Sequence, residues 1–204
     1  MRSITALLLV SLGVCPVFAM SPATGTLLVA TEELRDPRFS ETVILLLHYG
    51  PDGAVGVAIN RPTWVDAAES FPGIPIPDGY TGHIYFGGPV APANIVTLVR
   101  LPDSGELDLD PIVDDVYVGT SREFLRQTVI AADTEQALRL YAGYASWDGG
   151  QLDREIAAGS WRVIPASAEF IFAAEPLELW LELHAPVSEL RVSWLDDRPT
   201  LALR

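Results

Sequence analysis

Two apolar, β-rich runs separated by a short turn constrain the fold of this chain most strongly. Residues 43–47 (VILLL) are apolar on both faces of a strand, which is typical of a central strand in a sheet. Residues 50–53 (GPDG) form a turn sequence, and residues 54–59 (AVGVAI) continue as a second strand. The segment 43–59 is therefore predicted to be a β-hairpin, which requires an antiparallel pair.

Further short elements are spread along the whole chain. Strands are predicted at residues 26–31, 84–86, 95–101, 116–119, 138–145 (with a helix as the alternative), 161–164 and 189–195. Helices are predicted at residues 64–71, 120–131, 151–158 and 176–184, and loops at 72–82 and 102–115. Helices and strands are interspersed without a regular βαβ rhythm, so the predicted class is α+β. No repeat or linker divides the chain, which indicates a single domain after residue 19.

The first nineteen residues match a secretory signal peptide. Arg2 supplies a basic start, residues 4–14 are apolar, and residues 17–19 (VFA) fit a signal-peptidase site. The apolar stretch would span only about half of a hydrocarbon core, so a stable transmembrane helix is disfavoured. We therefore expect a mature chain of residues 20–204 in the periplasm or outside the cell. The alternative is translation from Met20, which would leave the protein in the cytoplasm.

Charge and cysteine usage exclude several classes of protein. The chain carries 13 Arg and no Lys against 27 acidic residues, which gives a net charge of −14. The Arg residues are scattered and offer no basic run, so we expect no nucleic-acid partner. Cys15 is the single cysteine, which excludes a disulfide framework and a Cys-based zinc site. A lipoprotein acylated at Cys15 is disfavoured because Val14 is bulky for the preceding position.

No catalytic or cofactor-binding motif is complete. The glycines of residues 50–56 (GPDGAVG) lie in a turn that enters a strand, whereas a phosphate loop needs a helix after its glycines. Residues 119–123 (GTSRE) lack the final glycine of a nucleophile elbow, so Ser121 is predicted to begin a helix. An EF-hand starting at Asp108 lacks both its glycine and its final glutamate. The His residues are isolated in the sequence, and we expect neither a metal site nor a cofactor.

Four segments carry the strongest resemblance to known proteins. They are residues 25–30 (GTLLVA) with 34–39 (LRDPRF) and 42–43 (TV); residues 52–62 (DGAVGVAINRP); residues 86–90 (FGGPV); and residues 143–147 (GYASW) through 150–152 (GQL), Glu155 and Trp161. Together, in this order, they resemble the YqgE/AlgH family (UPF0301, DUF179), a group of bacterial proteins without an established biochemical activity. The resemblance covers roughly residues 25–172, most of the expected mature chain.

The resemblance implies an α+β fold in which a bent mixed β-sheet forms a pseudo-barrel with flanking helices. It also implies a cytoplasmic protein labelled as a transcriptional regulator, a label that reflects a genetic association rather than a DNA-binding mechanism. This chain departs from the family pattern at Thr31-Glu32 and at Tyr49. It also adds the export signal and a longer tail beyond about residue 185.

The same segments define a candidate ligand-binding cleft. Asp36 can accept local backbone N–H bonds, while Trp147 and Gln151 lie four apart around a helix start and can face one pocket. Gly87 and Gly88 allow the backbone to approach either a neighbouring strand or a ligand. The predicted cleft residues are Asp36, Asn60, Gly87, Gly88, Trp147 and Gln151. The alternative for all of them is that they maintain the fold.

Three functions follow from these observations. The favoured hypothesis is a non-enzymatic binding, regulatory or interaction protein with an unknown protein or small-molecule partner, because no catalytic constellation is complete. The alternative is an enzyme, such as a hydrolase, that uses a cleft near Asp36 and Trp147. A DNA-binding transcriptional regulator is the least compatible with the strong negative charge.

Overall fold

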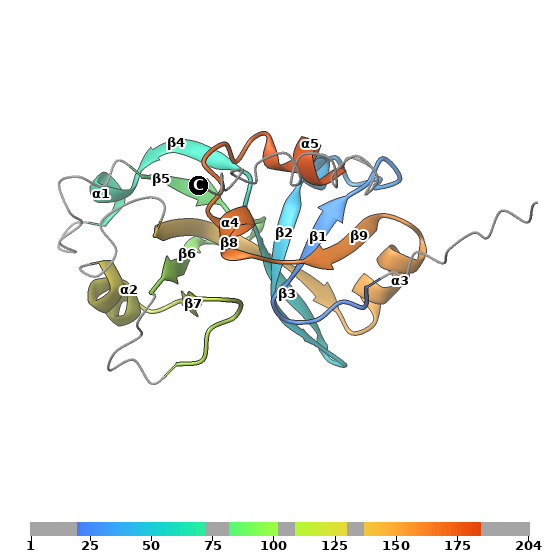
Figure 1. Ribbon diagram of the computed structural model, residues 1–204, viewed down its shortest axis with the longest axis horizontal. Coiled ribbons are helices and arrows are strands. Elements are labelled where there is room, and N and C mark those ends of the chain that lie inside the picture. The colour runs from blue at the N-terminus through green and yellow to red at the C-terminus, as the bar shows by residue number, and fades with distance from the viewer. Residues whose placement is uncertain (1–19, 72–81, 102–108, 130–136, 185–204) are drawn as a thin grey trace, which may run out of the picture.

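Short strands and short helices alternate along residues 20–71, 82–101, 109–129 and 137–184, which are the parts of the chain that the computed structural model describes (Figure 1). The strands are β1 (Thr26–Ala30), β2 (Val43–Gly50), β3 (Gly53–Ala58), β4 (Pro62–Asp66), β5 (His83–Phe86), β6 (Val90–Arg100), β7 (Val116–Gly119), β8 (Leu138–Asp148) and β9 (Trp161–Pro165). The helices are α1 (Ala67–Ser70), α2 (Arg122–Val129), α3 (Gln151–Ala157), α4 (Ala168–Ile171) and α5 (Leu179–His184), with one 3-10 turn, η1 (Pro37–Phe39). The predicted α+β class is confirmed.

Strand β8 organises the sheet because it has partners along its whole length. The order of the strands is β4-β5-β8-β3-β2-β1-β9, and β6 pairs with β8 and β7 off this path. Residues 145–148 of β8 pair with β3, whereas residues 138–144 pair with β5 and β6. Only the β5–β8 pair is parallel among the described strands, so the sheet is mixed, as predicted. Its described path ends at β4 and β9, and it is not closed into a barrel.

The predicted hairpin at residues 43–59 is confirmed. Strands β2 and β3 pair antiparallel, with Gly50 opposite Gly53 across a two-residue turn. Gly53 has φ +141°, and a Cβ there would lie 2.3 Å from the backbone oxygen of Trp147. Only glycine therefore allows the hairpin turn to pack against the end of β8, the strand that carries Trp147.

The predicted helix at residues 64–71 is wrong over its first part, which forms strand β4. Thr63 lies in β4, and its Oγ1 donates a hydrogen bond to the backbone oxygen of Ile84 on β5 (2.5 Å). The helix that follows, α1, has four residues. Its N-terminal cap is Asp66, whose Oδ1 accepts from the backbone N–H of Glu69 (3.1 Å). Pairing with a neighbouring strand therefore overrides the local preference for a helix at residues 64–66.

The other elements agree with the sequence pattern apart from their ends. Ser121 Oγ accepts from the backbone N–H of Phe124 (3.0 Å), so Ser121 begins α2 as predicted. The predicted helix at 176–184 is present as the shorter α5, and 138–145 is a strand. Helix α4 was not predicted, although Ser167 caps it by accepting from the backbone N–H of Phe170 (3.3 Å). Five predictions concern segments outside the described residues: the signal peptide, most of the loop at 72–82, the first half of the acidic loop, the end of the helix at 120–131 and the strand at 189–195.

One charged side chain lies inside the core. Arg139 on β8 is 3% exposed, and it donates from Nη1 to the backbone oxygen of Ile171 (3.0 Å) and from Nη2 to that of Ala173 (2.5 Å). Its guanidinium also lies 4.9 Å from the ring centre of Tyr85 and 5.6 Å from that of Phe172. Arg139 thereby ties β8 to the C-terminal end of α4, where backbone carbonyls favour a cation.

Candidate functional site

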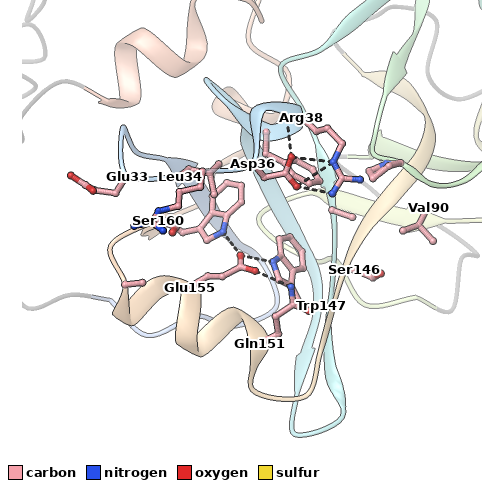
Figure 2. Close-up of a pocket in the computed structure, with 16 residues that line it drawn as sticks. Glu33, Leu34, Asp36, Arg38, Val90, Ser146, Trp147, Gln151, Glu155 and Ser160 are labelled. Atoms are coloured by element: carbon pink, nitrogen blue, oxygen red, sulfur yellow. Dashed lines mark hydrogen bonds and ion pairs between the residues drawn. The ribbon is translucent and has the colours of Figure 1, made fainter.

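A cleft of about 690 Å³ lies between the loop that follows β1, the end of β8, helix α3 and the start of β9 (Figure 2). Asp36, Trp147 and Gln151 line this cleft, so the structure brings together three of the six predicted site residues. They come from segments that are distant in the sequence, and the pairing of β8 with the β2–β3 hairpin and of β9 with β1 brings those segments together.

The carboxylate of Glu155 is the centre of the hydrogen bonds in the cleft. Its Oε2 accepts from the indole N–H of Trp147 (3.0 Å) and from that of Trp161 (2.8 Å). Its Oε1 accepts from the side-chain amide of Gln151 (2.9 Å). Figure 2 shows Glu155 reaching from α3 toward Trp147 and Gln151. One carboxylate therefore fixes two indole rings and an amide, and such bonds to a charged acceptor are stronger than neutral ones.

Aromatic rings form an ordered wall of the cleft. The ring centres of Trp147 and Trp161 are 6.1 Å apart at an interplanar angle of 82°, and those of Phe39 and Trp161 are 6.2 Å apart at 67°. These are edge-to-face contacts, which aromatic pairs prefer over face-to-face stacking. Both Trp side chains are buried apart from the surface that they present to the cleft.

An ion pair connects Asp36 and Arg38, which both line the cleft. Asp36 accepts from Arg38 through two side-chain oxygens, with the shortest contact, to Nη2, at 2.7 Å. The same carboxylate accepts from the backbone N–H of Arg38 (3.0 Å), which is the local turn predicted from the sequence. The hydrogen bond from the Arg38 guanidinium lowers the pKa of Asp36 below its ordinary value. Asp36 is therefore a carboxylate at neutral pH.

A turn before α3 positions Gln151. Gly150 adopts a left-handed conformation with φ +68°, which favours glycine. The side-chain oxygen of Gln151 accepts from the backbone N–H of Asp148 (3.1 Å), three residues earlier in the turn. Gln151 is therefore bonded at both ends, to the turn and to Glu155.

The structure places Asn60 outside the cleft. Its side chain is 4% exposed, its Oδ1 accepts from the backbone N–H of Val43 (2.9 Å), and its Nδ2 donates to the backbone oxygen of Glu41 (2.9 Å). Asn60 therefore fastens the end of β3 to the start of β2. This geometry corresponds to the alternative of fold maintenance, because both polar ends of the amide are occupied.

Gly87 and Gly88 approach a neighbouring strand and do not line the cleft. A Cβ on Gly87 would lie 2.3 Å from the backbone oxygen of Gly143 on β8. A Cβ on Gly88, which has φ +155°, would lie 2.3 Å from the carbonyl carbon of Tyr144. The close approach of backbone that the sequence indicated is therefore to β8, which explains why two glycines stand at this point.

Sequence reasoning did not assign Glu155, Phe39, Trp161 or Arg38 to the cleft. Glu155 carried one available signal, because it lies four residues after Gln151 on the same face of α3. Phe39 and Trp161 carried none, since the loop after β1 meets β9 only in the folded sheet. Arg38 is two residues from Asp36, and a bidentate pair at that spacing depends on the turn conformation.

Two carboxylates of the acidic loop have structural partners. In the acidic loop, Asp115 pairs with Arg100 (3.0 Å), and Asp114 accepts from the backbone N–H of Ala168 (2.8 Å) at the start of α4. In the described ranges no group of three or more His, Cys, Asp or Glu side chains is arranged to hold a metal ion. None of the helices in these ranges is long and apolar enough to cross a membrane.

An open, bent mixed sheet with an aromatic cleft beside α3 defines a class of single-domain α+β proteins. Within that class the chain belongs to the AlgH-like family, whose profile (DUF179) matches residues 27–188. The resemblance predicted from the four sequence segments is therefore confirmed.

Relatives and solved structures agree with this assignment. The chain is 33% identical over 172 residues to a UPF0301 protein of Streptomyces avermitilis, covering 80% of this chain and 86% of the relative. It is 36% identical over 166 residues to a UPF0301 protein of Paracoccus denitrificans, covering 78% and 87%. The solution structure of the AlgH protein from Pseudomonas aeruginosa is 28% identical, with a TM-score of 0.65 over 90% of this chain and 98% of that one. A crystal structure of a protein from Corynebacterium diphtheriae is 26% identical, with a TM-score of 0.66 over 82% and 90%.

Proposed function

We propose that this protein is a non-enzymatic binding protein that holds a small molecule in the cleft between Asp36 and Trp147. The observation that carries the proposal is the network around Glu155, which fixes two indole rings and Gln151 by hydrogen bonds within the protein. A wall that is ordered in advance lowers the entropic cost of binding. The volume of the cleft, about 690 Å³, lies within the range of small-molecule sites.

The polar groups of the cleft favour binding over catalysis because they are paired with one another. Arg38 lowers the pKa of Asp36, so this carboxylate is a poor general acid at neutral pH. Glu155 already accepts three side-chain hydrogen bonds. Ser146 and Ser160 line the cleft, but the described lining residues include no His that could activate a hydroxyl. These pairings support a binding protein over the hydrolase alternative.

The lining indicates the chemistry of the ligand. The rings of Phe39, Trp147 and Trp161 suit a flat, apolar portion of the ligand. Arg35 is an exposed lining residue without an ion pair in the described part of the chain, so it is available to an acidic group. We therefore infer a small aromatic or planar acid as the ligand class.

The test is a thermal-shift screen of the purified protein against small aromatic acids, followed by calorimetry on every hit. A ligand at 100 times its Kd should stabilise the protein by about 2.7 kcal/mol. Phe39→Ala and Arg35→Gln should each weaken binding, whereas Leu177→Ala, a change at an exposed apolar residue of another surface, should leave it unchanged. A hit that binds equally well to all three variants would place the ligand elsewhere. Turnover of a hit would establish the enzyme alternative instead.

The net charge of −14 supports the expectation that nucleic acid is not a partner, and several of the described Arg residues are also occupied. Arg38, Arg100 and Arg126 are each paired with a carboxylate, and Arg139 is buried in the core. Neutralising phosphates requires several free cations on one face. A gel-shift experiment at low salt should therefore show no binding of duplex DNA, and a salt-dependent shift would restore the DNA-binding hypothesis.

We further propose that the protein acts outside the cytoplasm. The proposal rests on the signal sequence at residues 1–19, which lies outside the described residues. Fractionation of the native cell tests it, with the mature chain expected in the periplasmic or secreted fraction. N-terminal sequencing cannot replace this measurement, because cleavage after Ala19 and initiation at Met20 yield the same chain. Recovery in the cytoplasm would refute export.

A further inference from the structure

Helix α5 and the turn that leads into it are apolar on two sides. Leu179 and Leu183, four residues apart, are 1% and 3% exposed and belong to the core beside β1, against which α5 packs (Figure 1). Leu177 and Leu181, also four apart, are 69% and 58% exposed. Residues at this spacing lie on one side of a helix. A helix that is apolar on both sides is normally buried on both, and the described chain covers only one side of α5.

The two exposed leucines line a groove of about 410 Å³. Its opposite wall consists of the residues just before β2 and those between β3 and β4. Hydrogen bonds within the protein hold this wall: Arg61 donates to the backbone oxygens of Arg38 (2.7 Å) and Ser40 (2.8 Å). Asn60 donates to the backbone oxygen of Glu41 (2.9 Å). A groove with a fixed wall loses little conformational entropy when a segment occupies it.

A half-buried cation, Arg61, lies in this groove. It makes no salt bridge with a described residue, and both of its hydrogen bonds lead to uncharged backbone oxygens. Glu41 also lines the groove, but its side chain is exposed and forms no salt bridge within the described ranges. The groove therefore fits an apolar segment that brings a carboxylate to Arg61.

The chain continues from α5 with a segment of this kind, in the tail that sets it apart from the family pattern. Residues 189–195 (ELRVSWL) alternate between polar and apolar, and they are predicted to be extended. In an extended segment the apolar side chains of Leu190, Val192 and Trp194 share one face. Residues 196–197 (DD) follow directly and supply two carboxylates. The tail thus offers the apolar face and the charge that the groove lacks.

The tail is long enough to return to the groove. Helix α5 ends at His184, and Pro186 disfavours a helical conformation for the residue before it, so we expect the chain to leave the helix axis there. An extended chain from His184 to Trp194 spans up to about 33 Å, at about 3.3 Å per residue. The way back along the helix to Leu177 is about 10 Å, at about 1.5 Å per residue. The apolar residues of the tail can therefore reach both exposed leucines after a turn.

We propose that the groove beside α5 is the docking site of the chain's own residues 189–197. The apolar face of that segment covers Leu177 and Leu181, and its carboxylates face Arg61. Docking in this way buries the side of α5 that the described chain leaves exposed. The proposal does not depend on the function proposed for the cleft, because among the described residues the groove and the cleft share no lining residue.

Disulfide cross-linking of the mature chain, residues 20–204, tests the proposal. That chain has no cysteine, because Cys15 precedes it, so introduced cysteines are its only thiols. Leu181→Cys with Trp194→Cys should form an intramolecular disulfide under mild oxidation, detected by peptide mass spectrometry in the monomer band of a non-reducing gel. Glu182→Cys with Trp194→Cys is the matched control: its separation in sequence is nearly the same, but Glu182 is exposed and lies outside the groove. The control pair should react at least about tenfold more slowly.

Thermal stability gives a second measurement that needs no cysteine. Trp194→Ala and Leu181→Ala should each lower Tm by about 3–6 °C, because each removes apolar surface that docking buries. Alanine is at least as good a helix former as leucine, so a loss at Leu181 has to come from its contacts. The double variant should lose little more than the larger single loss, since both changes remove the same contact. Leu109→Ala, at an exposed leucine outside the groove, should leave Tm within about 2 °C.

Faster cross-linking of the Leu181 pair within one chain, together with a non-additive loss of Tm, supports docking of the tail. A disulfide found only in dimers would assign the groove to the tail of a second copy and would overturn the proposal. Equal cross-linking rates for the Leu181 and Glu182 pairs would also overturn it, because they would show a tail without a preferred place. Additive losses of Tm, or no loss, would have the same consequence. If the double alanine variant does not fold, the ratio of the cross-linking rates decides the outcome.

Discussion

Removing the carboxylate of Glu155 should destabilise the whole protein, because that group is the common acceptor of two indole N–H groups. Trp147 is 7% exposed and Trp161 is 3% exposed, so both indole N–H groups depend on this acceptor in the folded protein. Glu155→Ala leaves both N–H groups buried and unpaired. Each unsatisfied donor costs about 1–3 kcal/mol, so we expect a loss of about 3–5 kcal/mol in the free energy of unfolding.

The conservative change should cost far less, for a reason specific to this geometry. Both indole bonds end on Oε2, so in Glu155→Gln the remaining carbonyl oxygen can occupy that position and keep both of them. Only the bond from Gln151 to Oε1 is lost, because the NH2 group that replaces Oε1 cannot accept a hydrogen bond from the Gln151 amide. We expect Glu155→Gln to lose about 1 kcal/mol.

Urea denaturation followed by tryptophan fluorescence and by far-UV circular dichroism measures both variants, with Glu182→Ala, an exposed glutamate on α5, as the control. At about 2–4 °C per kcal/mol for a chain of this size, Glu155→Ala should lower Tm by about 6–20 °C. The control should stay within about 0.5 kcal/mol of the wild type. Equal stability of Glu155→Ala and Glu155→Gln would refute the reasoning, because it would show that the indole bonds do not depend on that oxygen.

Four further changes test other parts of the structure. Arg139→Lys should cost about 2–4 kcal/mol by urea denaturation, since an ammonium cannot replace a guanidinium that donates to two carbonyls and lies over two rings. Gly87→Ala places a Cβ 2.3 Å from a backbone oxygen of β8, and it should cost more than about 2 kcal/mol or abolish soluble expression. Ser121→Ala removes the cap of α2 and should cost about 1 kcal/mol, whereas Ser121→Asp should retain stability. The pKa of Asp36 is lowered by Arg38, so the stabilisation from this pair is present above the unfolded pKa near 3.8 and is lost as the pH falls through the folded pKa. Because the pair is largely solvent-exposed, Asp36→Asn should cost less than about 1 kcal/mol at pH 7, and the two proteins should converge in urea denaturation at about pH 2.

Each of these expectations has a contradicting outcome. Wild-type stability of Arg139→Lys would show that the buried cation is held by something other than the two carbonyls. A soluble, undisturbed Gly87→Ala would mean that β8 can move away from the glycines at little cost. Equal stability of Ser121→Ala and Ser121→Asp would remove the capping role. A stability difference between the wild type and Asp36→Asn that grows as the pH falls would reverse the sign of the linkage and refute the role of the ion pair.

Much of the fold could be predicted from local signals in the chain. The hairpin at residues 43–59, the strand at 138–145 and the cap at Ser121 all depend on residues close together in the sequence. The helix predicted at 64–71 was wrong because Thr63 finds a partner on β5, and nothing in its neighbourhood indicates that strand. The mixed sheet implied by the family resemblance is present, and in the described chain it is not closed into a barrel, since its path ends at β4 and β9.

The candidate site was predictable only in part, and the reasons differ from residue to residue. Asp36 and Gln151 lie in turns that local chemistry indicates, and both line the cleft. Asn60 and Gly87 carry the same kind of signal but serve the packing of β2, β3 and β8. A polar or glycine residue at the end of a strand does not indicate whether it faces a neighbouring strand or a ligand. Burial and hydrogen-bond partners decide this, and both are properties of the folded sheet.

The amino-acid sequence by itself determined the fold class, the order of most short elements, the acidic charge and the resemblance to the YqgE/AlgH family. These features depend on composition, on hydrophobic periodicity and on contacts between residues a few positions apart. Only the tertiary structure decided that Glu155 joins Trp147 to Trp161, and that Asn60 fastens the end of β3 to the start of β2. These contacts depend on the register of each strand against its neighbour and on the residue at which β8 changes partners. Both follow from the packing of the whole sheet.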